Sequence, residues 1–146
     1  MIRRPRRGAR GAALIEFVLV LPLFLTILLG VIDWGWYFVV REIAINATRE
    51  GARIGSVAPG PAAAATDAGA AVQNYLRNAL GDAHVATPAV DSTGCAVAGY
   101  RCISVTLADF RPVPGANRSI TGLQEWTRVP TAFTVRTDMR LEVQSP

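Results

Sequence analysis

An apolar run from Ala12 to Val40 limits the folds open to this chain, because only Glu16 and Asp33 carry charge within it. A helix needs roughly 20 apolar residues to cross a bilayer, so residues 14–39 are long enough to do so. A secretory signal has a shorter apolar core that ends in a cleavage site of small residues, and nothing of that kind precedes Arg41. We therefore expect a single membrane span that the chain retains.

Glu16 stands five residues after Gly11, at the edge of this apolar run. A carboxylate in hydrocarbon is costly and indicates a functional site. The stretch from Gly11 to Phe17 resembles the processing site of type IV prepilins and pseudopilins, which a prepilin peptidase cuts after the glycine. The resemblance implies that the cut falls between Gly11 and Ala12, and that Glu16 compensates the positive N-terminus of an adjoining subunit. The alternative is a glutamate at the cytoplasmic interface with no such role.

A leader over residues 1–11 would contain five arginines and no acid. A cut after Gly8 would place Ala13 at the fifth mature position, so a cut after Gly11 fits better. Basic residues beside a span hold that end of it in the cytoplasm. Without the leader, the chain has 10 basic and 11 acidic groups and a net charge of about −1. The main argument for nucleic-acid binding, a basic folded domain, is therefore lost. The arginines are Arg3, Arg4, Arg6, Arg7 and Arg10.

Two further features of the apolar run bear on packing. Pro22 removes one backbone hydrogen bond, so it either kinks the helix or is merely tolerated in lipid. Asp33 is an acid at the membrane edge that calls for a cationic partner, either Arg41 or an arginine of a neighbouring subunit. It adjoins three aromatic residues that we expect in a belt at the outer headgroups: Trp34, Trp36 and Tyr37.

The helix should continue beyond the membrane. Ile43, Ala47, Glu50 and Ile54 form a stripe at helical spacing, suited to packing on another helix or a sheet. Ala44 and Gly51 lie beside this stripe. The Pro59-Gly60-Pro61 run then ends the helix, which gives a transmembrane and extended helix over residues 12–57. We expect a linker over residues 58–65 and then a short helix, with Thr66 or Asp67 as its cap and Gly81 as its stop.

In the last third of the chain, apolar residues recur at every second position instead of at helical spacing. Ile103, Val105 and Leu107 alternate with polar residues, and so do the apolar residues of 133–143, as expected for antiparallel strands with one buried face. His84 to Val90 predicts a weaker third strand. The long connection over residues 109–131 should contain hidden structure or carry function. The predicted fold is therefore α+β, with residues 66–146 forming a periplasmic or extracellular head.

Little in the chain predicts catalysis. His84 is the sole histidine and has no cysteine or acid at ligand or triad spacing, so we expect a packing or surface role, no catalytic or metal residues and no cofactor. Cys95 and Cys102 form an even pair in the outside part, which favours a disulfide over two reduced thiols. Trp126 in the long connection is either a partner-binding edge or part of the core.

Four segments together resemble the TadE-like pseudopilins of tight-adherence (Flp-type) pilus systems. They are residues 12–16, the Leu21-Pro22 pair, residues 30–35 and residues 47–53, and the similarity covers roughly residues 7–57. The last segment is the most specific and contains a signature of Arg49, Glu50, Gly51 and Arg53. One departure is that Trp36 and Tyr37 stand where family members commonly carry a basic residue.

The resemblance implies a minor subunit of the bacterial inner membrane, with a cytoplasmic N-terminus, that acts in pilus assembly and either enters the fibre or only primes it. It implies a prepilin peptidase, other pilins or pseudopilins and Tad assembly proteins as partners. We expect neither a nucleic acid nor a small-molecule substrate as a partner. Two alternatives stay open. One is a minor pseudopilin of type II secretion, and the other is an uncleaved, membrane-tethered binding or sensor domain.

Overall fold

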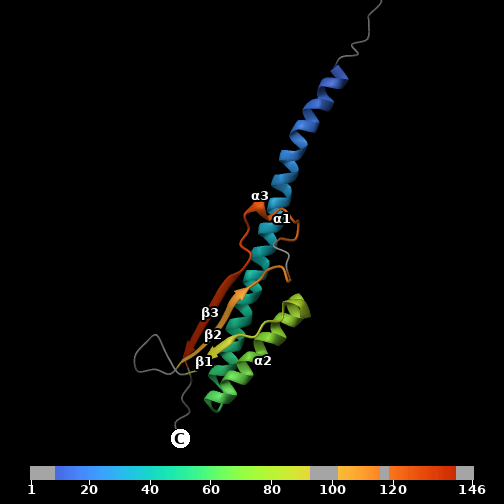
Figure 1. Ribbon diagram of the computed structural model, residues 1–146. Coiled ribbons are helices and arrows are strands. Elements are labelled where there is room, and N and C mark those ends of the chain that lie inside the picture. The colour runs from blue at the N-terminus through green and yellow to red at the C-terminus, as the bar shows by residue number, and fades with distance from the viewer. Residues whose placement is uncertain (1–8, 93–101, 116–118, 141–146) are drawn as a thin grey trace, which may run out of the picture.

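The computed structural model describes residues 9–92, 102–115 and 119–140. It confirms the predicted α+β fold, with a long apolar N-terminal helix, a further helix and a small antiparallel sheet (Figure 1). The elements in chain order are α1 (Ala9–Ser56), α2 (Pro61–Leu80), the 3-10 helix η1 (Asp82–His84), β1 (Ala89–Asp91), β2 (Cys102–Phe110), α3 (Gln124–Thr127) and β3 (Phe133–Arg140).

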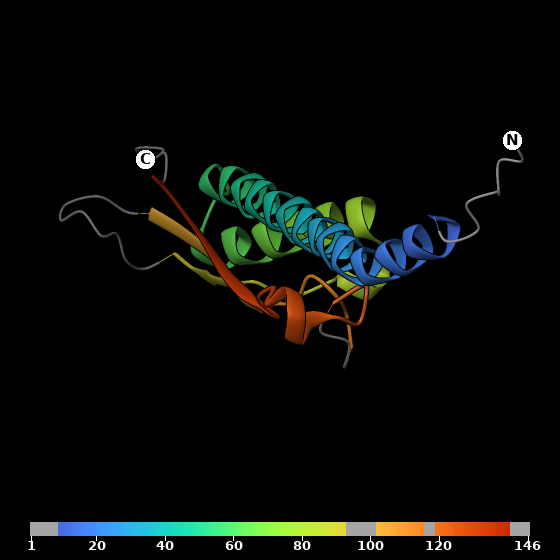
Figure 2. The same ribbon diagram turned by 90° about the horizontal axis from the view of Figure 1, so that it is seen from above.

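Helix α1 has two halves with different surroundings. Its N-terminal half projects alone out of the head, and its C-terminal half runs through the head (Figures 1 and 2). The helix continues through Pro22, whose carbonyl accepts a hydrogen bond of 2.8 Å from the Thr26 hydroxyl. It ends at Ser56, as the Pro59-Gly60-Pro61 run predicts.

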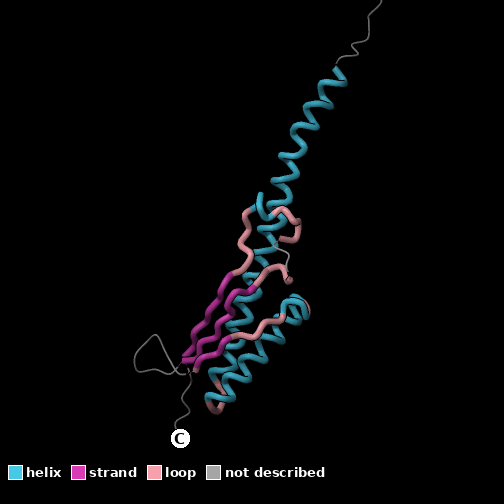
Figure 3. Tube along the Cα trace, viewed as in Figure 1, coloured by secondary structure: helices cyan, strands magenta, loops and turns pink. Residues whose placement is uncertain are grey.

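Helix α2 lies antiparallel to the C-terminal half of α1 and packs closely against it (Figure 3). The close approach is possible because Gly51 and Gly55 of α1 have no side chains. A Cβ on Gly51 would lie 3.0 Å from the Ala68 carbonyl oxygen, and one on Gly55 would lie 3.1 Å from the Ala64 carbonyl oxygen.

The predicted linker over residues 58–65 is too long. Helix α2 begins at Pro61, with Gly60 as its N-cap residue, so neither Thr66 nor Asp67 is the cap. Proline suits the first helical turn because its missing N–H would have no partner there. The predicted stop at Gly81 is confirmed, since this glycine follows the last helical residue with φ 84°.

The three strands form an antiparallel sheet in the order β1-β2-β3. Helix α1 covers β2 and β3 and helix α2 contacts β1, so the two helices pack on one face of the sheet. The predicted inward residues of β2, Ile103, Val105 and Leu107, are all buried. A partly buried hydrogen bond of 2.8 Å between the Thr48 and Thr137 hydroxyls also joins α1 to β3.

Strand β1 differs from its prediction. We expected a third strand from His84 to Val90, but His84 lies in η1 and the strand covers Ala89–Asp91. The end predicted for the last strand, residues 141–143, lies outside the described residues, as does Cys95. The predicted Cys95–Cys102 disulfide therefore stays a prediction.

Candidate functional site

The N-terminal half of α1 is an apolar rod that no part of the described head covers. Residues 11–20 are all exposed, and the large apolar side chains from Leu14 to Leu28, apart from the half-buried Leu21, are 42–73% exposed. Residues 11–29 number 19, or about 28 Å of helix at 1.5 Å per residue, close to the roughly 30 Å of a bilayer's hydrocarbon core. Among the described residues, α1 is the one helix long and apolar enough to cross a membrane.

The predicted processing residues lie at the free end of this rod. Gly11, Ala12 and Glu16 are exposed, and a Cβ built on Gly11 would meet nothing within 4 Å. Within the described part of the chain, the Glu16 carboxylate has no hydrogen-bond or salt-bridge partner. The structure thus leaves this carboxylate accessible to another molecule.

Asp33 lies at the other end of the rod and is buried, with 2% of its surface exposed. Its Oδ1 accepts a hydrogen bond of 3.1 Å from the Thr121 backbone N–H. Its Oδ2 accepts hydrogen bonds from the hydroxyls of Thr121, at 2.6 Å, and of Thr127, at 3.3 Å. These three bonds, which we call the Asp33 clamp, fasten the segment around α3 to α1.

The Asp33 clamp corrects the prediction of a cationic partner. The donors are two neutral hydroxyls and a backbone amide, and no salt bridge joins Asp33 to Arg41 in the described ranges. Each carboxylate oxygen has acceptor sites for more than one donor, so a buried carboxylate can be satisfied without a cation. The expected arginine of a neighbouring subunit is not needed to explain this residue.

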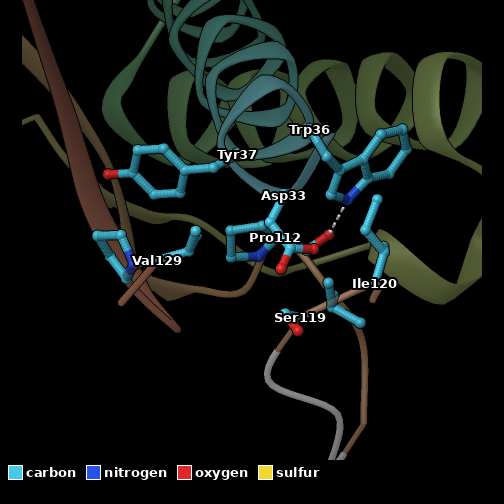
Figure 4. Close-up of a pocket in the computed structure, with 9 residues that line it drawn as sticks. Asp33, Trp36, Tyr37, Pro112, Ser119, Ile120 and Val129 are labelled. Carbon is cyan, nitrogen blue, oxygen red and sulfur yellow. Dashed lines mark hydrogen bonds between the residues drawn. The ribbon is translucent and has the colours of Figure 1, made fainter. Parts of the chain in front are cut away.

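The aromatic residues beside Asp33 also hold the head on α1. Trp34 Nε1 donates to the Thr127 carbonyl at 3.0 Å, and Trp36 Nε1 donates to the Pro112 carbonyl at 2.8 Å (Figure 4). Tyr37 makes an edge-to-face contact with Phe133 of β3, with ring centroids 5.6 Å apart. The indole N–H groups of Trp34 and Trp36 and the ring of Tyr37 thus contact the head, which the predicted belt at the outer headgroups did not include.

His84 packs where the head meets α1. Its Nε2 lies 3.2 Å from the Pro112 carbonyl oxygen, its Nδ1 lies 3.2 Å from the Leu80 carbonyl oxygen, and its ring meets Trp36 edge-on. In the described ranges, no group of three or more histidine, cysteine, aspartate or glutamate side chains is placed to hold a metal ion.

A cavity of about 10 Å³ lies next to Asp33, Trp36 and Pro112 (Figure 4). The Ser119 hydroxyl, which also lines it, is buried without a hydrogen-bond partner among the described residues. A space of this size, with polar groups in its wall, suits one water molecule.

The signature at residues 49–53 has a buried side and an exposed side. Gly51 and Ala52 are buried in the packing of α1, whereas Arg49 and Arg53 are exposed. Glu50 accepts from Arg53 Nη2 at 2.7 Å, and this hydrogen bond lowers the pKa of Glu50 and raises that of Arg53.

The stripe predicted for the outer half of α1 is displaced. Ala47 of the stripe is buried, but Glu50 and Ile54 are only partly buried, and the buried face also contains Thr48 and Gly55. The prediction placed Ala44 and Gly51 beside the stripe but gave no weight to Thr48 and Gly55, because it followed the larger apolar side chains.

The fold and the site together define an α+β protein whose long N-terminal helix has an uncovered apolar half. The family model for TadE-like proteins matches residues 11–53, which lie entirely within α1. This match confirms the resemblance to TadE-like proteins over that segment and fits a single-pass protein associated with tight-adherence pili. No curated protein and no solved structure matches the chain.

Proposed function

We propose that this protein is a minor pseudopilin that acts in the assembly of a tight-adherence pilus. The observation that carries the proposal is the uncovered apolar half of α1, which presents Glu16 near its start and lies within the TadE-like segment. An apolar surface of this size is not stable in water, so it requires lipid or the apolar helices of other subunits around it.

The proposed membrane state is a single pass through the bacterial inner membrane. The leader arginines stay in the cytoplasm, and the head lies on the periplasmic side. A prepilin peptidase then cuts between Gly11 and Ala12, so that the mature chain begins with a charged amine on the apolar rod.

Glu16 is the proposed assembly residue. A carboxylate in hydrocarbon costs several kcal/mol unless a positive charge pairs with it, and the new N-terminal amine of an adjoining subunit supplies such a charge. Pairing therefore favours subunits that sit side by side with their apolar halves in register. The other proposed partners are pilins, pseudopilins and Tad assembly proteins, which contact the helix and the head. We propose no enzymatic activity.

The test of this proposal compares Glu16→Gln with Glu42→Gln in cells that carry the complete pilus system. Both substitutions remove one exposed carboxylate from α1, but Glu42 lies on the part of α1 that packs against the head. We expect Glu16→Gln to be processed normally and to abolish crosslinking to other pilins together with piliation, while Glu42→Gln behaves as wild type. Normal piliation and crosslinking with Glu16→Gln would refute the charge-pairing role.

A further inference from the structure

The structure shows where along α1 the head begins. A Cβ built on Gly30 would lie 3.8 Å from Thr127 Cγ2, whereas one on Gly11 would meet nothing. Asp33 and Trp34, just beyond Gly30, hydrogen bond to the segment that contains α3. Because residues 11–29 are just long enough for the hydrocarbon core, the membrane surface on the head side falls at the level of Gly30 to Trp34.

Helix α3 lies at this same level. Its last residue, Thr127, donates its hydroxyl to Asp33 and accepts from Trp34 Nε1 through its carbonyl. Figure 1 shows α3 beside α1 at the point where α1 leaves the head. A membrane that surrounds residues 11–29 of α1 therefore also reaches α3.

The side chains that α3 and the preceding loop present are large and apolar. Trp126 is 76% exposed and Ile120 is 48% exposed. The alternative that Trp126 belongs to the core is thus wrong. Tryptophan is enriched at the headgroup level of membranes, where its ring is in apolar surroundings and its N–H is hydrated.

We propose that α3 and the loop before it form a second membrane contact, in which Trp126 and Ile120 lie among the lipid headgroups on the head side of the bilayer. Glu125 and Arg128 are exposed on either side of Trp126, so the contact stays at headgroup depth. Since the Asp33 clamp and Trp34 fasten this segment to α1, the contact fixes the tilt of the head relative to the bilayer. The inference depends on α1 crossing the membrane, and it does not depend on leader removal or on pilus assembly.

The test labels the full chain with 5-fluorotryptophan and places it in nanodiscs of phosphatidylcholine and phosphatidylglycerol. The chain has 3 tryptophans, and a Trp126→Phe variant assigns the Trp126 resonance. Fluorine relaxation is then measured with a spin-labelled lipid that carries its label near the headgroup, and separately with a water-soluble gadolinium chelate. Trp36, which is half-buried against the head, is the internal control.

We expect the spin-labelled lipid to relax Trp126 several-fold more than Trp36, and about as strongly as Trp34. Strong relaxation of Trp126 by the gadolinium chelate, without an effect of the lipid label, would overturn the proposal because it would place the ring in water. Protection of Trp126 from both agents would overturn it too, because a protein surface would then cover the ring. Both readouts are independent of the prepilin peptidase, so a negative result here would not count against the proposed function.

Discussion

Asp33 is the residue that joins the anchor to the head. Its two carboxylate oxygens receive all three hydrogen bonds of the Asp33 clamp, and the donors lie 88 and 94 residues further along the chain. The sequence shows an acid at a membrane edge and therefore predicts that it has a partner. It does not show which partner, because Thr121 and Thr127 belong to no local pattern and reach Asp33 only through the fold of the sheet.

We predict that Asp33→Asn loosens the Asp33 clamp. The amide NH₂ cannot accept a hydrogen bond, so at least one buried donor loses its acceptor at a cost of about 1–3 kcal/mol. Hydrogen exchange at the Thr121 amide should become roughly 10- to 100-fold faster, while exchange in β2 stays unchanged. Asp67→Asn on the exposed side of α2 is the control and should change neither. An unchanged exchange rate of the Thr121 amide in the Asp33→Asn variant would mean that the Asp33 clamp does not help to hold the segment around α3 on α1.

A second prediction at this scale concerns Asp138 on β3. Hydrogen bonds from Ser104 and then Arg136 lower the pKa of Asp138 below its ordinary value of 3.8. A lowered pKa in the folded state stabilises the fold above the unfolded pKa, and this contribution disappears as the pH falls through the folded pKa. Unfolding of wild type and Asp138→Asn between about pH 5 and 2 should therefore show the larger loss of stability in wild type. If the stabilities of wild type and Asp138→Asn fell equally over this pH range, the lowered pKa of Asp138 would be contradicted.

The contact between α1 and α2 depends on two glycines, one of which belongs to the family signature. Gly51 and Gly55 face Ala64, Ala68 and Val72 of α2, and these five residues are all buried. Small side chains on both helices let the backbones approach closely, which leaves no room for a methyl group. The exposed charges of the signature, Arg49 and Arg53, flank this packing face on the outside of the helix.

We predict that Gly51→Ala destabilises the head. Alanine normally stabilises a helix interior by up to about 1 kcal/mol relative to glycine, but here the Cβ would lie 2.5 Å from Val72 Cγ2 and 3.0 Å from the Ala68 carbonyl oxygen. Overpacking of this kind costs about 1–3 kcal/mol. Gly69→Ala on α2, where a Cβ would meet nothing within 4 Å, is the matched control and should stabilise. Denaturant unfolding measures both variants, and stabilisation by both would contradict the packing described.

At the level of elements, the sequence predicts regular periodicity better than boundaries. The length of α1 and the alternation in β3 follow from hydrophobic spacing, and both are confirmed. In β2 the apolar positions are buried as predicted, but Ser104 between them is buried too. The start of α2 was missed because proline and glycine were interpreted only as helix breakers, whereas Pro61 begins the helix. Strand β1 was placed too early because η1, a single turn, has no periodic signal.

The whole molecule consists of an apolar rod and a head that meet at Gly30 to Tyr37. The sequence predicts a span up to about residue 39, but the head already contacts the helix at residues 30–37. In the proposed membrane state, the boundary therefore lies about two turns closer to the N-terminus than the sequence predicts. This shift could not be predicted, because apolar and aromatic side chains suit lipid and a protein interface equally well, and only tertiary contacts distinguish the two.

The processing of this rod is the central claim at the scale of the whole molecule. The most direct test is the intact mass of the membrane-extracted protein, expressed with and without the prepilin peptidase. We predict a chain that begins at Ala12 only when the peptidase is present, and no such cleavage in a Gly11→Leu variant, whereas Gly8→Leu is cut as wild type. A chain that keeps its leader arginines in the presence of an active peptidase would contradict the pseudopilin account and leave a tethered periplasmic domain.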